Sequence, residues 1–172
     1  MKRPMEAVTV VTYRKEFSAA FEQLNRDWIE MHFELEDADR EIFSDPEAAV
    51  LAEGGQIFFV LEGHEVQGTC AVLPHGEGSF EIAKMAVAPA ARGRGYGDLL
   101  MEAAIRFAAD AGARRIVIVS NTVLQPAIRL YEKHGFVRVP LTAEGRYQRA
   151  NIRLERDLES TAPAALPAEG GR

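Results

Sequence analysis

The chain has 172 residues, of which 47% are hydrophobic and 27% charged, a composition typical of a soluble globular protein with a sizeable core. Its net charge of -6 disfavours a nucleic-acid partner, because the phosphates would repel it. A single cysteine excludes an internal disulfide, and no apolar run approaches the ~20 residues that span a bilayer. We therefore expect one cytoplasmic domain with no membrane partner, and the scattered histidines predict no metal site.

The N-terminal part predicts a strand followed by helices. Residues 8–13 are β-branched and favour a strand. Apolar residues then recur at three- and four-residue steps, as on one face of a helix: Phe17, Ala20, Phe21, Leu24, Trp28 and Met31. Residues 30–47 are acidic, and at their end the segment Asp-Pro-Glu at 45–47 is typical of a second helix N-terminus.

Three strands are predicted next, at residues 56–61, 65–73 and 79–87. The turns between them contain glycine, which favours an antiparallel meander. The third strand leads into a loop of glycines and arginines, and an alanine-rich helix then runs to Gly112.

The remaining chain continues as strand, helix and strands. Residues 115–120 predict a strand parallel to residues 79–87, because a helix separates the two. Pro126 and Gly135 mark the ends of the next helix. Two further strands are predicted, at residues 136–140 and 151–158.

The element order predicts an α+β fold, βαα-βββ-αβαβ(β), with a mixed, mostly antiparallel central sheet and helices on both faces. Residues 1–158 would form the single domain. Residues 159–172 are rich in small residues and proline, which favours a disordered tail.

The loop between residues 87 and 98 is typical of an anion site, since alternate glycines aim the free N–H groups of a helix start at one point. A Walker loop needs Lys-Ser/Thr after its last glycine, but Asp98 follows Gly97. The dinucleotide fingerprint needs a third glycine at position 98, so it fails as well.

The spacing that does fit is Arg/Gln-x-x-Gly-x-Gly, at Arg92, Gly95 and Gly97. A second block runs from Asn121 through residues 126–136, Pro-Ala-Ile-Arg-Leu-Tyr-Glu-Lys-His-Gly-Phe. Together the blocks resemble the two half-motifs of the GNAT superfamily of acetyl-CoA-dependent N-acetyltransferases. The resemblance implies the fold above, up to about residue 158, and transfer of an acetyl group from acetyl-CoA to a primary amine within a ternary complex.

The resemblance also implies the residues that hold the cosubstrate. The acetyl-CoA-binding residues would be Met85, Ala86, Val87, Arg92, Gly93, Arg94, Gly95, Tyr96, Gly97, Asp98 and Asn121. Main-chain groups of residues 85–87 would pair with the pantetheine arm, while N–H groups of the loop and either arginine would bind the diphosphate. Tyr96 can equally pack on its helix, and Asn121 can be an ordinary strand-ending residue.

Two side chains are candidates for the catalytic groups. Glu81 is the candidate base that deprotonates the amine; it can instead be a solvated carboxylate or a partner of Lys84, with water carrying the proton. Tyr131 is the candidate acid for the leaving thiolate, or else a core tyrosine. Cys70, in an apolar strand, is not expected to carry an acyl group.

The acceptor would be a small-molecule or peptide amine. Its site would be walled by the N-terminal helices and the later loops, with the following residues as candidates: Trp28, His32, Phe33, Tyr147 and Arg149. The acidic stretch can attract a cationic amine or be a solvated face. Homodimers are frequent in the family, and the alternative function is a non-catalytic acyl-CoA-binding or sensing module of the same fold.

Overall fold

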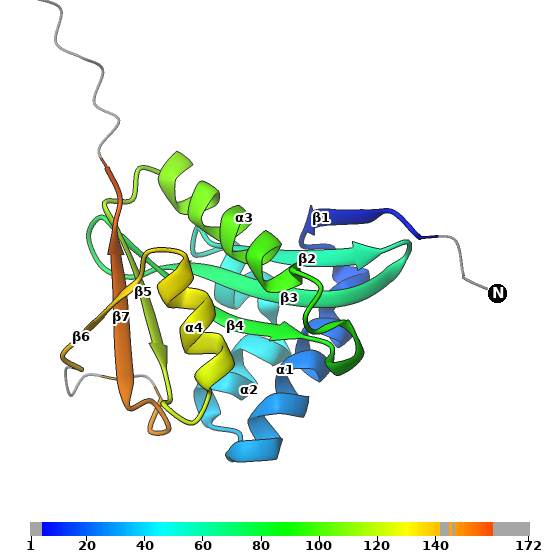
Figure 1. Ribbon diagram of the computed structural model, residues 1–172, viewed down its shortest axis with the longest axis horizontal. Coiled ribbons are helices and arrows are strands. Elements are labelled where there is room, and N and C mark those ends of the chain that lie inside the picture. The colour runs from blue at the N-terminus through cyan, green and yellow to red at the C-terminus, as the bar shows by residue number, and fades with distance from the viewer. Residues whose placement is uncertain (1–4, 142–144, 146, 160–172) are drawn as a thin grey trace, which may run out of the picture.

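A computed structural model describes residues 5–141, 145 and 147–159. The described residues form one seven-stranded sheet in the order β1-β2-β3-β4-β5-β7-β6 (Figure 1). Its strands are β1 (Val8–Thr12), β2 (Gln56–Glu62), β3 (Glu65–Pro74), β4 (Ser79–Val87), β5 (Arg115–Ser120), β6 (Val137–Val139) and β7 (Ile152–Asp157). The β2–β3–β4 meander is antiparallel and β4 pairs with β5 in parallel, which confirms the predicted mixed sheet.

Helices cover both faces of the sheet, as the sequence predicted (Figure 1). They are α1 (Ser18–His32), α2 (Asp37–Ser44), α3 (Tyr96–Asp110) and α4 (Gln125–Lys133), with 3-10 turns η1 (Lys15–Phe17) and η3 (Pro89–Ala91). Alternate strand residues serve the two faces: Phe58, Val60 and Ile82 pack with α3 and α4, while Ile57, Phe59 and Leu73 pack with α1 and α2.

The second helical region contains one helix more than the sequence predicted. Helix α2 begins at Asp37, well before Pro46. At the predicted N-terminus a short π-helical turn begins, η2 (Glu47–Leu51), and the Asp45 carboxylate accepts from the Ala48 N–H at 3.1 Å.

A capping box starts α2, in which the Glu36 carboxylate accepts from the backbone and the Glu36 N–H donates to Asp39 Oδ2 at 2.9 Å. Two residues of the acidic stretch, Glu36 and Asp39, thus cap the helix, while Glu34, Asp37 and Glu41 are exposed.

The sheet opens between β4 and β5. Their parallel ladder pairs Ser79 with Arg115, Phe80 with Ile116 and Glu81 with Val117. Beyond Glu81, the described residues of these two strands make no further pairs with each other, although β4 runs on to Val87 and β5 to Ser120. The ends of β4 and β5 therefore do not pair with each other, and a ligand can lie between them.

A bulge in β4 lies at this opening. The register against β3 shifts between Thr69–Ala86 and Ala71–Ala83, so two residues of β4, Lys84 and Met85, lie opposite one residue of β3. Lys84 has φ 53°, a left-handed conformation that is rare for a residue with a side chain. The bulge turns the end of β4 without ending the strand.

No helix in the described part of the chain is long and apolar enough to cross a membrane. The expected disordered tail lies outside the described residues except for Glu159, which is exposed.

Candidate active site

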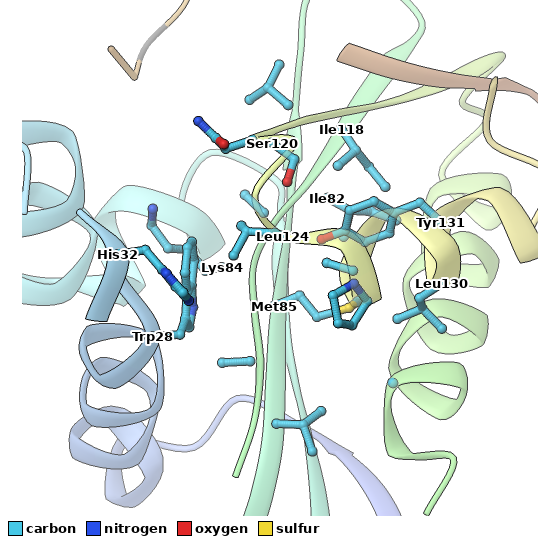
Figure 2. A pocket seen from close by; sticks show the side chains of 18 of the residues that line it. Trp28, His32, Ile82, Lys84, Met85, Ile118, Ser120, Leu124, Leu130 and Tyr131 are labelled. Atoms are coloured by element: carbon cyan, nitrogen blue, oxygen red, sulfur yellow. The ribbon is translucent and has the colours of Figure 1, made fainter. Parts of the chain in front are cut away.

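A cavity of about 650 Å³ runs from the start of α3, through the gap between β4 and β5, to the end of α1. This volume is within the range of small-molecule and cofactor sites. Of the thirteen residues that the sequence predicted for the site, only Arg94 is absent from its lining. Figure 2 shows Tyr131 and Leu130 on one side of the cavity, Trp28 and His32 on the other, and Met85 between them.

The three glycines of the loop are required for two different structural reasons. Gly93 and Gly95 have φ of 78° and 82°, which residues with a side chain adopt only at a cost. A Cβ on either would meet no atom within 4 Å, so the space in front of them is open. Gly97 instead allows close helix packing, because a Cβ there would lie 2.9 Å from Leu130 Cδ2 of α4.

The first turn of α3 lies at this open space, since Gly95, Tyr96, Gly97 and Asp98 all line the cavity. Gly95 is the N-cap residue of α3 and has no side chain with which to cap it. The N–H groups of the first turn therefore lack both an intrahelical acceptor and a side-chain cap. Together with the helix dipole they form a site that fits a diphosphate.

The two arginines of the loop have different surroundings: one lines the cavity, and the other pairs with a carboxylate of the protein. Arg92 is exposed and lines the cavity. Arg94 pairs with the Glu62 carboxylate at 2.6 Å, and the Tyr96 hydroxyl donates to the same carboxylate at 3.0 Å. Of the two arginines, Arg92 is thus the one placed to meet a ligand, while the ring of Tyr96 is buried against its helix.

A carboxylate also lies in the first turn of α3, where it would repel phosphate if left alone. Asp98 pairs with Lys133 at 2.9 Å and with His134 Nε2 at 2.8 Å, both at the end of α4. Hydrogen bonds from Lys133 and His134 lower the pKa of Asp98. The pairing offsets its charge and joins the two helices beside the loop.

The gap between the strands is lined by the residues expected beside a pantetheine arm. Met85, Ala86 and Val87 line it from β4, and Ile118 to Asn121 line it from β5 and the loop that follows. The Asn121 amide donates to the Arg149 carbonyl at 2.7 Å, while its Oδ1 accepts from the Val123 N–H at 2.9 Å. Asn121 therefore also holds the loop between β5 and α4.

The two candidate catalytic groups both line the cavity. Glu81 is half-buried where the β4–β5 ladder ends. Tyr131 is buried on α4, and this burial raises the pKa of its phenol to about 12. The phenol therefore carries its proton at neutral pH. It also belongs to the core on the α3 side, so the packing role considered for it holds at the same time.

A buried charge network that the sequence did not reveal closes the α1 end of the cavity. The Lys84 ammonium lies 2.5 Å from Asp39 Oδ1, and the Arg149 guanidinium donates to both Asp39 oxygens at 2.6 and 2.7 Å. Arg149 also pairs with Glu36 at 3.1 Å. Both cations lie over the Tyr147 ring, at 4.2 and 4.5 Å from its centroid.

The network shifts the pKa values of its members. Burial opposes ionisation of Asp39, but hydrogen bonds from Arg149 and the charge of Lys84 outweigh it and lower the pKa of Asp39 to about 2. Burial lowers the pKa of Lys84 to about 8 although the charge of Asp39 opposes this. Because these residues belong to β4, α2 and the segment before β7, no local sequence pattern could have joined them.

Cys70 lies in the core between β2 and β4 and is fully buried, with Sγ 3.8 Å from the Leu100 carbonyl oxygen. Burial raises the pKa of its thiol. Among the described residues, no group of three or more His, Cys, Asp or Glu side chains is placed to hold a metal ion.

A model of the acetyltransferase (GNAT) family matches residues 17–136, more than half of the chain. The match includes the glycine-rich start of α3, the opened strands and α4. The chain therefore belongs to the GNAT family of acetyltransferases.

Curated relatives with assigned names match only part of their own length. Mycothiol acetyltransferase of Corynebacterium efficiens is 28% identical over 123 residues, which are 72% of this chain and 42% of that protein. N-acetyltransferase 8 of Rattus norvegicus is 30% identical over 92 residues, 50% of this chain and 41% of that protein. The chain thus matches about two fifths of the length of these two relatives.

Solved structures support the same fold over most of the chain. A GNAT-family acetyltransferase of Staphylococcus aureus Mu50 has a TM-score of 0.81 at 16% identity and covers 89% of this chain and 100% of its own. A Salmonella typhimurium protein solved with its cofactor acetyl-CoA has a TM-score of 0.71 at 21% identity, covering 93% and 99% of the two chains. At sequence identities of 16% and 21%, these structures show that the fold is shared and nothing more.

Proposed function

We propose that this chain is an N-acetyltransferase that moves an acetyl group from acetyl-CoA to a primary amine by direct attack in a ternary complex. The observation that carries the proposal is the continuous cavity, which joins the open helix start of α3 to Glu81 and Tyr131. A diphosphate at the helix start and a pantetheine arm between β4 and β5 would bring the thioester to this pair of side chains.

The donor would be held mainly by main-chain groups. N–H groups of residues 93–98 would bind the diphosphate, and Arg92 would add a charge-assisted hydrogen bond. The unpaired edge of β4 would pair with the pantetheine amides, as an added strand does. The bulge at Lys84 and Met85 leaves main-chain N–H groups out of the β3 ladder, where they could stabilise the oxyanion of the tetrahedral intermediate.

The proton transfers would fall to the two side chains. An ammonium group has a pKa near 10, so it must lose a proton before it attacks, and Glu81 would take that proton directly or through water. The amine nitrogen then forms a bond with the thioester carbon, and the carbon–sulfur bond breaks with its electron pair on sulfur. Tyr131 would donate a proton to that thiolate, since its pKa of about 12 keeps the phenol protonated beforehand.

The test is transfer by the purified protein. Incubation with acetyl-CoA and a broad panel of amines should release free thiol only when an accepted amine is present. Calorimetry with CoA on the same preparation separates binding from catalysis. Binding of CoA without turnover on any amine would favour the sensing module of the same fold, and preference for ATP or NAD over CoA would contradict both functions.

A further inference from the structure

Among the described residues, Lys84 is the one non-glycine residue with a positive φ, at 53°. This conformation is unfavourable for a residue with a side chain, so it persists only where the surrounding structure holds it. The Lys84 side chain is also only 2% exposed, although a lysine is almost never buried unless it is paired. Lys84 thus combines a strained backbone with a buried charge, and both belong to the bulge of β4.

The partner of the Lys84 ammonium is itself held in place. The Asp39 carboxylate, whose Oδ1 lies 2.5 Å from the ammonium, accepts two hydrogen bonds from Arg149 at 2.6 and 2.7 Å. Its Oδ2 also accepts from the Glu36 N–H at 2.9 Å, within the capping box of α2. Because the first turn of α2 fixes this carboxylate, the carboxylate in turn fixes the ammonium and the main chain that carries it.

The bulge is held from the opposite side as well. Lys84 and Met85 turn to opposite sides of β4, and Met85 packs against the core that β4 forms with α3 and α4 (Figure 2). The bulge therefore lies between this core and the acceptor end of the cavity, beside α1. The ion pair with Asp39 ties the bulge to the helices at that end.

We infer that Lys84 is a positioning residue, whose ion pair with Asp39 holds the bulge in the conformation that aims its main-chain N–H groups at the thioester carbonyl. This inference rests on the proposed acetyl transfer and adds a residue to it. The ammonium faces Asp39, so Lys84 acts on the thioester through the main chain. Without the pair, the bulge would relax toward a negative φ and turn those N–H groups away.

The carbonyl stretch of bound acetyl-CoA reports this geometry without an acceptor and without turnover. Hydrogen bonds to a carbonyl oxygen weaken the carbon–oxygen double bond, so they lower its stretching frequency. The difference between infrared spectra taken with unlabelled acetyl-CoA and with acetyl-CoA isotope-labelled at the thioester carbon isolates this band from the amide bands of the protein. On the wild-type protein we expect the band at a lower frequency than for the free cosubstrate.

Lys84→Met removes the ammonium and keeps a long side chain at the unfavourable φ. We expect this variant to lose at least half of the band shift. Its affinity for CoA, which has no thioester, should change by less than about 3-fold, since the diphosphate contacts at α3 remain. With an accepted amine, kcat should fall by on the order of 10- to 100-fold, because the oxyanion donors are misplaced.

Lys84→Gly separates the conformation from the charge. Glycine adopts a positive φ readily, so this variant lacks the ammonium but can keep the bulge. We expect it to retain more of the band shift than Lys84→Met does, although it removes more of the side chain. A larger loss in Lys84→Gly than in Lys84→Met would show that the ion pair does not act through the backbone and would overturn the inference.

Arg149→Met is the matched control for the stability of the network. It removes the other cation from Asp39, but Arg149 lies between β6 and β7, and Lys84 keeps its partner. Urea denaturation should show lower stability in both methionine variants, while only Lys84→Met loses the band shift. Equal band positions in the two variants, or no shift in bound wild type, would overturn the inference and not the proposed transfer. Failure of acetyl-CoA to bind the wild type would contradict both.

Discussion

The Lys84 ammonium and the Asp39 carboxylate lie 2.5 Å apart, with side chains 2% and 0% exposed. The pair ties the bulge of β4 to the first turn of α2, so it links the proposed thioester site to the helices that wall the acceptor end. A buried ion pair is not by itself strong evidence for stability, but loss of one partner leaves the other charge buried without compensation.

Asp39→Asn should therefore destabilise the protein strongly. It would remove the carboxylate that Lys84 pairs with and leave Arg149 with Glu36 alone, and we expect a loss of about 3–5 kcal/mol in the free energy of unfolding. Urea denaturation measures this loss. Asp37→Asn is the matched control, since Asp37 is fully exposed, pairs only at the surface with Arg40, and should change stability by less than about 0.5 kcal/mol. If the two variants lowered the free energy of unfolding by similar amounts, the buried network would make no special contribution to stability.

Stability should also fall in acid through Asp39. Its pKa is lowered to about 2 in the folded protein, below the value of 3.8 for an unperturbed side chain, so its contribution is complete above about pH 5. As the pH falls from 5 to 2.5, the unfolded chain takes up the proton first, and that contribution declines by on the order of 1–2 kcal/mol. The stability difference between wild type and Asp39→Asn should narrow accordingly; a constant difference would contradict a lowered pKa.

Tyr131→Phe should lower kcat by at least about 10-fold and leave the affinity for CoA unchanged, because it removes the proposed proton donor and keeps the ring. Steady-state rates and calorimetry with CoA measure the two quantities. Tyr13→Phe, outside the cavity, is the control and should keep the wild-type kcat. An unchanged kcat in Tyr131→Phe would contradict the proposed proton donation and show that the tyrosine only packs in the core.

Cys70→Ala should retain kcat within about 2-fold, since direct transfer needs no acyl-enzyme. The thiol is fully buried, and burial raises its pKa, so it is a poor nucleophile. The variant should lose about 1 kcal/mol of stability through the lost packing, which thermal denaturation can check. Loss of transfer in a folded Cys70→Ala protein, together with acetyl label on Cys70 in the wild type, would contradict direct attack.

The sequence predicted those parts of the molecule whose signals are local. Gly95 and Gly97 show the helix start by their spacing, and β-branched or apolar runs bounded by turn residues predicted every strand within a few positions. The sequence could not predict that Arg94 pairs with a carboxylate instead of lining the cavity. Its partner Glu62 lies on β2, and only the folded sheet brings the two side chains together.

The acceptor end of the cavity was harder to predict from the sequence, because its residues also come from distant parts of the chain. Asp39 and Arg149 are 110 residues apart in the chain, and an acidic stretch looks the same whether its carboxylates are solvated or buried against cations. The bulge at Lys84 also has no local signal, since lysine has no preference for a positive φ. Long-range pairing, rather than periodicity, determines this part of the site.

The most direct measurement of the central claim is the affinity for CoA compared with that for pantetheine, by calorimetry on the wild-type protein. Pantetheine keeps the arm that would lie between β4 and β5 but lacks the diphosphate that the start of α3 would bind. We expect saturable binding of CoA at least about 10-fold tighter than that of pantetheine, given the charge-assisted and helix-dipole contacts. No heat with CoA at millimolar concentration, or equal affinities for the two ligands, would contradict the account.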